Sequence, residues 1–270
     1  MQDWNPYLHF RQMWSHRELI LQLTKREISS RYKGSYLGIL WTFVTPILMI
    51  SIYTFVFSGV FKARWPAGSS SKMEFALIIF CGLIAFNIFS ELISKAPGLI
   101  LTNVNYVKKV VFPLEILPVV LLGSALIQGI ISMFILIIVQ LFVTGVINWT
   151  IILMPVVLLP IMLMSLGIGW FLSSLGVFLR DIGHIIGVGL TALMFLSPIF
   201  YPISSIPNGI KILYVLNPLT YVVEDLRRVM IWGNTPDWLS WFVSLFIGFI
   251  ISFAGLVWFQ KTKKTFADIL

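Results

Sequence analysis

The chain has 270 residues, of which 58% are apolar and only 11% are charged, and its mean hydropathy is +0.94. An average soluble domain carries about 25% charged residues, so this composition excludes an ordinary water-soluble globular protein. The net charge of +8 is compatible with a nucleic-acid partner, but the positions of the charges indicate a membrane instead.

Residues 1–33 predict a cytoplasmic amphipathic segment that lies on the membrane surface. On a helix with 100° per residue, five apolar side chains share one side: Phe10, Trp14, Leu21, Ile28 and Tyr32. Leu19 and Leu23 lie off this side and interrupt the pattern. A solvated basic tail is the alternative interpretation.

Six long apolar stretches follow, near residues 35–61, 74–94, 114–143, 150–178, 182–200 and 238–259. About 20 apolar residues, each with a rise of 1.5 Å, cover the ~30 Å hydrocarbon core of a bilayer. We therefore expect an all-α membrane protein with six transmembrane helices in one domain, residues 34–260. A short tail, residues 261–270, follows it.

The distribution of basic residues orients these stretches. If the N-terminus is cytoplasmic, only six of the 19 Lys and Arg residues fall on the external side: Lys62, Arg64, Lys72, Lys211, Arg227 and Arg228. By the positive-inside rule, both termini are then cytoplasmic. Anionic lipid headgroups are the expected counterions of the basic residues, and no nucleic-acid partner is expected.

Two connections between the apolar stretches are too long to be tight turns. Residues 97–112 are flanked by prolines, carry Lys108 and Lys109, and predict a structured cytoplasmic segment. Pro202, Pro207 and Pro218 break residues 201–236 into short apolar pieces. They predict short re-entrant or interfacial helices on the external side.

Residues inside the apolar stretches indicate how the helices pack. Glu91 and Lys95 lie four residues apart near the end of the second stretch, where they can form an ion pair. The fourth stretch contains small residues that allow helices to approach closely: Gly167, Gly169, Ser173, Ser174 and Gly176.

Neither a nucleotide site nor a catalytic centre is visible in the sequence. There is no phosphate-binding loop of the form GxxxxGK[ST], and no group of Cys, His and carboxylate residues has the spacing of a metal site. The apolar stretches also lack the buried carboxylates of a proton-driven carrier. We therefore expect no catalytic residue, no metal and no cofactor in this chain, and the energy for any uphill transport must come from another protein.

The first apolar stretch carries an aromatic pattern. Five aromatic side chains fall within an arc of ~100° on an ideal helix: Tyr36, Phe43, Tyr53, Phe57 and Phe61. Such a face can be exposed to lipid or serve as a packing seam. The functional interpretation is a surface along a pore on which the C–H faces of sugar rings slide.

Several motifs occur in an order that resembles one protein family. They are residues 30–41 (SRYKGSYLGILW) before Pro46, residues 178–182 (FLRDI), residues 201–203 (YPI), residues 216–220 (LNPLT), Glu224 and Arg227. This ordered set, which covers nearly the whole chain, resembles the permease subunits of ABC-2-type exporters of cell-surface polysaccharides. These exporters move O-antigen, capsule or teichoic acid.

The resemblance implies a homodimeric permease that assembles with two copies of a separate ATP-binding subunit, which binds the ATP and magnesium. It implies an interface helix over residues 10–32 and a coupling segment over residues 97–112 that docks on the ATPase. The implied ATPase contacts are Asn103, Asn105, Tyr106, Lys108, Lys109, Arg180 and Asp181. The implied external gate, residues 201–236, includes Tyr201, Pro202, Asn217, Pro218, Glu224 and Arg227. The resemblance also favours the channel-lining role of the aromatic face.

The expected function is export of an undecaprenyl-linked polysaccharide, O-antigen first, across the bacterial inner membrane. Arg26, Arg31 and Lys33 are candidate contacts for the diphosphate linker, although the positive-inside rule alone also explains them. The alternatives are an ABC-2 exporter of teichoic acid, capsule, a drug or a lipid, and a membrane enzyme that uses polyprenyl phosphates. The enzyme requires clustered carboxylates or a metal site at one membrane face.

Overall fold

The computed structural model describes residues 13–56, 72–109, 112–207, 209 and 211–270. Within these ranges every regular element is helical and no residue lies in a strand, so the predicted all-α class is confirmed. The α-helices are α2 (Arg17–Arg31), α3 (Trp41–Tyr53), α4 (Lys72–Lys95), α5 (Val104–Lys109), α6 (Ile116–Thr144), α7 (Met154–Phe178), α8 (Ile182–Phe195), α9 (Lys211–Leu216), α10 (Pro218–Met230), α11 (Trp238–Thr262) and α12 (Phe266–Ile269). The 3-10 helices used below are η1 (Gly38–Leu40), η3 (Ala96–Gly98), η4 (Leu101–Asn103) and η6 (Ile203–Ser205).

Five helical segments of the described chain are long and apolar enough to cross a bilayer. They are Gly38–Val56, Met73–Gly98, Ile116–Thr144, Trp149–Phe178 and Trp238–Ile269. The remaining predicted span, residues 182–200, contains α8, which has only 14 residues. At 1.5 Å per residue it is ~21 Å long, shorter than the ~30 Å hydrocarbon core. Bends and turns follow it, because Pro198 disfavours helix at the residue before it.

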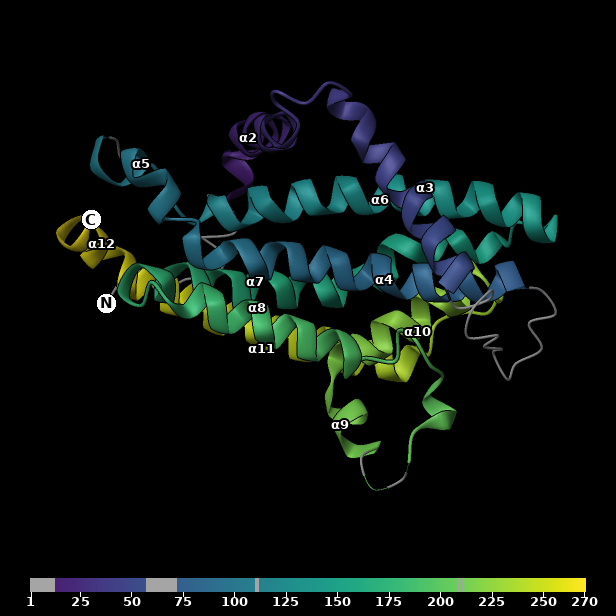
Figure 1. Ribbon diagram of the computed structural model, residues 1–270. Coiled ribbons are helices and arrows are strands. Elements are labelled where there is room, and N and C mark those ends of the chain that lie inside the picture. Colours follow the sequence, from purple (N-terminus) through teal and green to yellow (C-terminus); the bar gives the residue numbers. More distant parts are fainter. Residues whose placement is uncertain (1–12, 57–71, 110–111, 208, 210) are drawn as a thin grey trace.

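α4 forms the centre of a helical bundle (Figure 1). It is buried over most of its length and contacts α3, α6, α7, α8 and α10. α6, α7, α8 and α11 run along the same direction as α4, and α5 and α12 lie together at one end of the bundle. α3 packs on α4 and α6 but leaves Ile47, Leu48 and Ile52 about half exposed.

α7 and α11 are in contact along much of their length because glycines remove the side chains between them. A Cβ atom on Gly167 would lie 2.3 Å from the carbonyl oxygen of Ile251, and one on Gly255 would lie 1.9 Å from that of Gly167. Gly176 lies equally close to η3, since a Cβ atom there would be 2.0 Å from the carbonyl oxygen of Pro97. The predicted packing role of the small residues in this stretch is confirmed.

A proline in α7 is compensated by a side chain of α11. Pro160 has no N–H, so the carbonyl of Val156, one turn earlier, lacks its helical donor. The indole Nε1 of Trp241 donates to this oxygen at 2.9 Å. In a bilayer, where water is absent, such an interhelical donor makes the proline tolerable.

The structure revises the predicted orientation of α2. Leu19 and Leu23 pack against Val120 of α6, and Leu23 is buried. Trp14 and Leu21, which lie on the predicted apolar face, are 66% and 61% exposed. The segment therefore presents one apolar side to the bundle and another outward. Because apolar residues occupy both the packed side and the outward side, Leu19 and Leu23 interrupt the one-sided pattern in the sequence.

Candidate functional site

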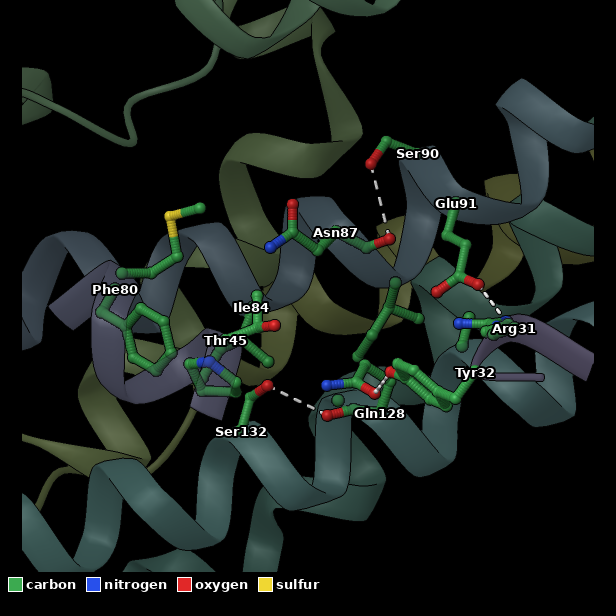
Figure 2. Close-up of a pocket in the computed structure, with 15 residues that line it drawn as sticks. Arg31, Tyr32, Thr45, Phe80, Ile84, Asn87, Ser90, Glu91, Gln128 and Ser132 are labelled. Carbon is green, nitrogen blue, oxygen red and sulfur yellow. Dashed lines mark hydrogen bonds and ion pairs between the residues drawn. The ribbon is translucent and has the colours of Figure 1, made fainter. Parts of the chain in front are cut away.

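A polar cavity of about 320 Å³ lies between α2, α3, α4 and α6 (Figure 2). Its volume falls at the lower end of the ~300–1,000 Å³ that ligand pockets span. Polar side chains from all four walls line it: Arg31, Tyr32, Thr45, Asn87, Ser90, Glu91, Gln128 and Ser132. A cavity of this kind at the edge of an apolar bundle is suited to a ligand with a polar head.

Gln128 of α6 holds the wall of the cavity together. Its Nε2 donates at 3.1 Å to the carbonyl of Thr42, the oxygen that Pro46 leaves without a helical donor in α3. Its Oε1 lies 3.5 Å from the hydroxyl of Tyr32, which follows α2. A single amide therefore joins α6 to both neighbouring helices.

Four charged side chains form a network at one side of the cavity. Arg31 makes an ion pair with Glu91 (Figure 2). It also donates to the hydroxyl of Ser124. The ammonium of Lys95 lies 3.3 Å from Glu91 and 3.2 Å from Glu27, so the predicted pairing of Glu91 with Lys95 is confirmed. Two cations balance two carboxylates here, and the Nε of Arg31 has no hydrogen-bond partner among the described residues.

The three candidate linker contacts occupy different environments. Arg31 alone lines the cavity. Arg26 donates from Nη1 to the hydroxyl of Tyr106 at 2.9 Å, and its guanidinium carbon lies 5.9 Å from the centre of that ring. Lys33 follows α2 and is exposed. An anionic ligand in the cavity would therefore meet Arg31 and would compete with Glu91 for it.

The helical residues described in the predicted coupling segment belong to η3, η4 and α5. Tyr106 stacks on Phe112 with ring centres 4.3 Å apart, and Arg26 fixes its hydroxyl, so the segment is tied to α2. Asn103 donates from Nδ2 to the carbonyl of Leu99 at 2.9 Å, whereas Asn105 is exposed. The side chain of Lys109 lies outside the described part of the structure.

The C-terminal tail joins the same end of the molecule. Lys108 of α5 donates to the carbonyl of Leu270, and the ring of Phe266 is buried against Phe259. Arg180 and Asp181 are exposed at the corner between α7 and α8, next to η3. The structure thus gathers the candidate coupling residues that it describes at one end of the bundle.

Arg227, a predicted gate residue, fastens α10 to the bundle. Its side chain is fully buried. Nε donates to the carbonyl of Ile78 in α4 at 3.1 Å, and Nη2 donates to the carbonyl of Ile199 at 2.6 Å. Nη1 donates to the carbonyl of Pro198 at 2.7 Å and to the carboxylate of Glu224 at 2.8 Å. One guanidinium therefore joins α10, α4 and the segment after α8.

The other predicted gate residues surround this connection. Asn217 is the N-cap of α10: its Oδ1 accepts from the N–H of Leu219 at 3.0 Å, while its Nδ2 donates to the hydroxyl of Ser197 at 2.9 Å. Pro218 takes the first helical position, where its missing N–H is harmless. The hydroxyls of Tyr201 and Tyr214 lie 2.7 Å apart. Pro202 precedes η6.

The residues of the predicted aromatic face are placed unevenly. Tyr36 precedes η1 and is fully exposed, and Phe43 in α3 is 44% exposed. Tyr53 is half-buried against the bundle. Phe57 and Phe61 lie outside the described residues. A continuous aromatic surface along a pore stays a prediction.

Comparison with known proteins decides the family. The sequence matches the ABC-2 type transporter family over residues 18–231. The chain belongs to this family. It is 26% identical over 260 residues to the O-antigen export system permease protein RfbA of Myxococcus xanthus, covering 96% of this chain and 97% of that protein. It is 26% identical to the protein of the same name from Klebsiella pneumoniae, covering 94% and 95% of the two chains. It is also 26% identical to the polysialic acid transport protein KpsM of Escherichia coli, covering 88% and 91%.

This ABC-2 family chain is thus a multi-pass protein of the bacterial inner membrane. Within the described ranges, no three His, Cys, Asp or Glu side chains lie close enough together to hold a metal ion. The charged network around Arg31 consists of paired charges, two cations with two carboxylates.

The buried carboxyl of Asp225 in α10 makes the stability of this ABC-2 family protein depend on pH. Asp225 is buried, and its Oδ1 accepts from the N–H of Asp237 at 2.8 Å. Burial raises the pKa of Asp225 to about 6. Because the folded pKa lies above the unfolded value near 3.9, the stabilising contribution is complete below pH ~4 and is lost as the pH rises through 6.

We expect Asp225→Asn to raise the melting temperature at pH 8 and to leave it unchanged at pH 4. The amide oxygen still accepts the backbone hydrogen bond, while the desolvated charge is gone. Melting curves of the purified protein between pH 4 and 8 measure this, with the exposed Asp181→Asn as a matched control. A variant less stable than the wild type at pH 8 would contradict the assignment.

Proposed function

We propose that this chain is the transmembrane permease subunit of an ABC transporter that exports lipid-linked cell-surface polysaccharide, O-antigen first, across the inner membrane. The observation that carries the proposal is the end-to-end similarity to O-antigen export permeases, which covers nearly the whole of each chain. The similarity to KpsM supports capsule export as a second candidate. Undecaprenyl diphosphate is the proposed lipid carrier.

The cavity beside Arg31 is the proposed entry site for the lipid-linked end of the substrate. Three of its walls are membrane-spanning helices, and α3 exposes apolar side chains beside it. A polyprenyl chain could remain in lipid along α3 while the diphosphate reaches the polar wall. The guanidinium of Arg31 suits a diphosphate because it donates several parallel hydrogen bonds to oxyanions.

The proposed motor is a separate ATP-binding subunit that docks at the end formed by α5, η3 and α12. Tyr106 of α5 is hydrogen-bonded to Arg26 of α2, and η3 directly continues α4. A displacement of this segment would therefore reach two walls of the cavity, α2 and α4. ATP and magnesium would bind the partner, and this chain would contribute the conduit.

The proposed assembly is a homodimer of six-span subunits with a channel between them. α3 and α8 support it, because both have exposed apolar sides and α8 contains no buried residue. Phe43 in the first span and Tyr36 just before it are exposed and would line the channel. The segment around Tyr201, Asn217 and Arg227 would form the external gate.

The decisive experiment is reconstitution of the chain with its ATPase partner in liposomes whose outer leaflet carries the lipid-linked polysaccharide. ATP-dependent transfer of the polymer to the lumen supports the proposal, and a deletion strain should lose the polymer from its surface. Transport of small amphiphiles without transport of polymer would instead indicate a drug or lipid exporter. Turnover of polyprenyl phosphate by the chain alone would indicate an enzyme.

Arg31→Gln is expected to lower polymer export by about 10- to 100-fold, because one or two charge-assisted hydrogen bonds to the diphosphate are lost. Surface polymer in the complemented deletion strain and substrate-stimulated ATP hydrolysis measure the effect. The matched control is Lys25→Gln, which removes an exposed charge of α2 that does not line the cavity.

The double variant Arg31→Gln/Glu91→Gln separates binding from structure. If Arg31 only neutralises Glu91, removal of both charges restores export. If Arg31 binds the diphosphate, the double variant stays as impaired as Arg31→Gln. Restored export in the double variant would contradict the linker role.

A further inference from the structure

A second cavity lies at the end of the bundle away from α5 and α12. It measures about 310 Å³ and is bounded by η6, α10, the loop after α10 and the start of α11. In Figure 1 this region lies near α10, on the side from which α9 projects. The lining is almost entirely polar or aromatic: Thr220, Tyr221, Glu224, Asp225, Arg228, Trp232, Asn234, Asp237 and Ser240, with Ile203.

The charges on the wall exclude most anionic ligands. Glu224, Asp225 and Asp237 line the cavity with one cation, Arg228, and the buried Arg227 pairs with Glu224, so three carboxylates face two guanidinium groups. A diphosphate or a carboxylate would be repelled by this excess. A metal ion is not favoured either, since the described side chains here do not converge on one point as metal ligands.

A buried hydroxyl at the wall lacks a partner. Thr220 is only 3% exposed, and its Oγ1 has no hydrogen bond among the described residues. A buried polar atom left in this way costs about 1–3 kcal/mol, so native proteins rarely keep one without a reason. A ligand that brings its own hydroxyl would supply the missing bond.

The remaining polar groups are held in place before any ligand arrives. The Nε of Arg228 donates to the carbonyl of Thr235 at 2.9 Å, and the Oδ2 of Asp237 accepts from the hydroxyl of Ser240 at 2.8 Å. Trp232 is half-buried beside them and offers an indole ring. Pre-organised groups lose less entropy when a ligand binds.

We propose that this cavity binds one sugar unit of the exported polysaccharide at the exit end of the permease. A pyranose ring matches the wall chemically. Its hydroxyls donate to the carboxylates of Glu224 and Asp237 and share a hydrogen bond with Thr220, its ring oxygen accepts from Arg228, and its C–H face packs on Trp232. The volume suits a single ring rather than a longer segment. The inference rests on the proposed function and adds a recognition step to it.

The test uses the full chain with its ATPase partner in nanodiscs. The probe is the lipid-free polysaccharide released from the envelope of the parent strain, titrated by calorimetry. Thr220→Val should weaken binding about 3- to 10-fold without lowering the melting temperature, because the hydroxyl has no partner among the described residues. Asp237→Asn should weaken binding about 10-fold. The matched control is Thr191→Val in α8, which should bind like the wild type.

Two results would overturn the inference. One is wild-type binding by both Thr220→Val and Asp237→Asn. The other is competition by inorganic pyrophosphate, which would indicate an anion site. Its failure is distinguishable from failure of the proposed function: in the first case the wild-type chain still exports polymer in liposomes, and in the second it does not.

Discussion

Arg227→Ala is expected to destabilise the fold by about 3–5 kcal/mol, the range for removing one partner of a buried charged pair. The substitution leaves the carbonyls of Pro198 and Ile199 without their donor. It also removes the hydrogen bond to Ile78, the contact by which the side chain reaches α4. The guanidinium of Arg227 fits beside Gly82, where a Cβ atom would lie 3.0 Å from Nη2. Because Gly82 has no side chain, it cannot fill the space that the guanidinium leaves.

Thermal unfolding in detergent and the yield of monodisperse protein measure this effect. Arg227→Met is the sharper variant, because it keeps apolar volume but supplies no donor, and it should be nearly as damaging as alanine. Arg228→Ala is the matched control on the same helix, where the hydrogen bond to Thr235 and the attraction to Asp225 are lost and the expected loss is about 1 kcal/mol. Equal stability of the Arg227 and Arg228 variants would show that the buried connection does not hold α10.

Hydropathy was sufficient to predict most of the fold, because a bilayer requires each crossing helix to be continuous and apolar. It failed at the fifth stretch, where apolar residues continue to 200 although the helix ends at Phe195. Ser197 and Pro198 lower the average hydropathy of this stretch only slightly. The helix nevertheless ends before them, because the residue that precedes a proline disfavours the helical conformation. The small residues around Gly167 were predicted correctly because close packing leaves a local pattern in the sequence.

The cavity was only partly predictable. Arg31 was selected for its charge, but its partner Glu91 lies far along the chain, and nothing local connects the two. A signal did exist in the third apolar stretch, where Ser124, Gln128 and Ser132 repeat every four residues and therefore share one helix face. Pro46 is a second signal in the sequence. It leaves the carbonyl of Thr42 in α3 without a helical donor, so a neighbouring helix must supply one, as Gln128 does.

Gly255→Ala is expected to be among the most damaging additions of a single methyl group within the described residues. The new Cβ would lie 1.9 Å from the carbonyl oxygen of Gly167 and 2.6 Å from its carbon, so backbone faces backbone and no side chain can yield. α7 and α11 must then separate, and the hydrogen bond of 2.7 Å between Ser174 and Thr262 and that from Trp241 to α7 would stretch with them. We expect a loss of ~3 kcal/mol or more, at the upper end of overpacking effects.

Gly187→Ala in α8 provides the matched control, because no atom beyond the neighbouring backbone of α8 itself lies within 4 Å of a Cβ at that position. The same substitution should there be neutral or stabilise the helix by about 0.5–1 kcal/mol. Melting temperatures of the two variants, measured side by side in detergent, should therefore shift in opposite directions. If the two variants melted together, the close approach of α7 and α11 would be wrong, since only contact between the two backbones distinguishes these glycines.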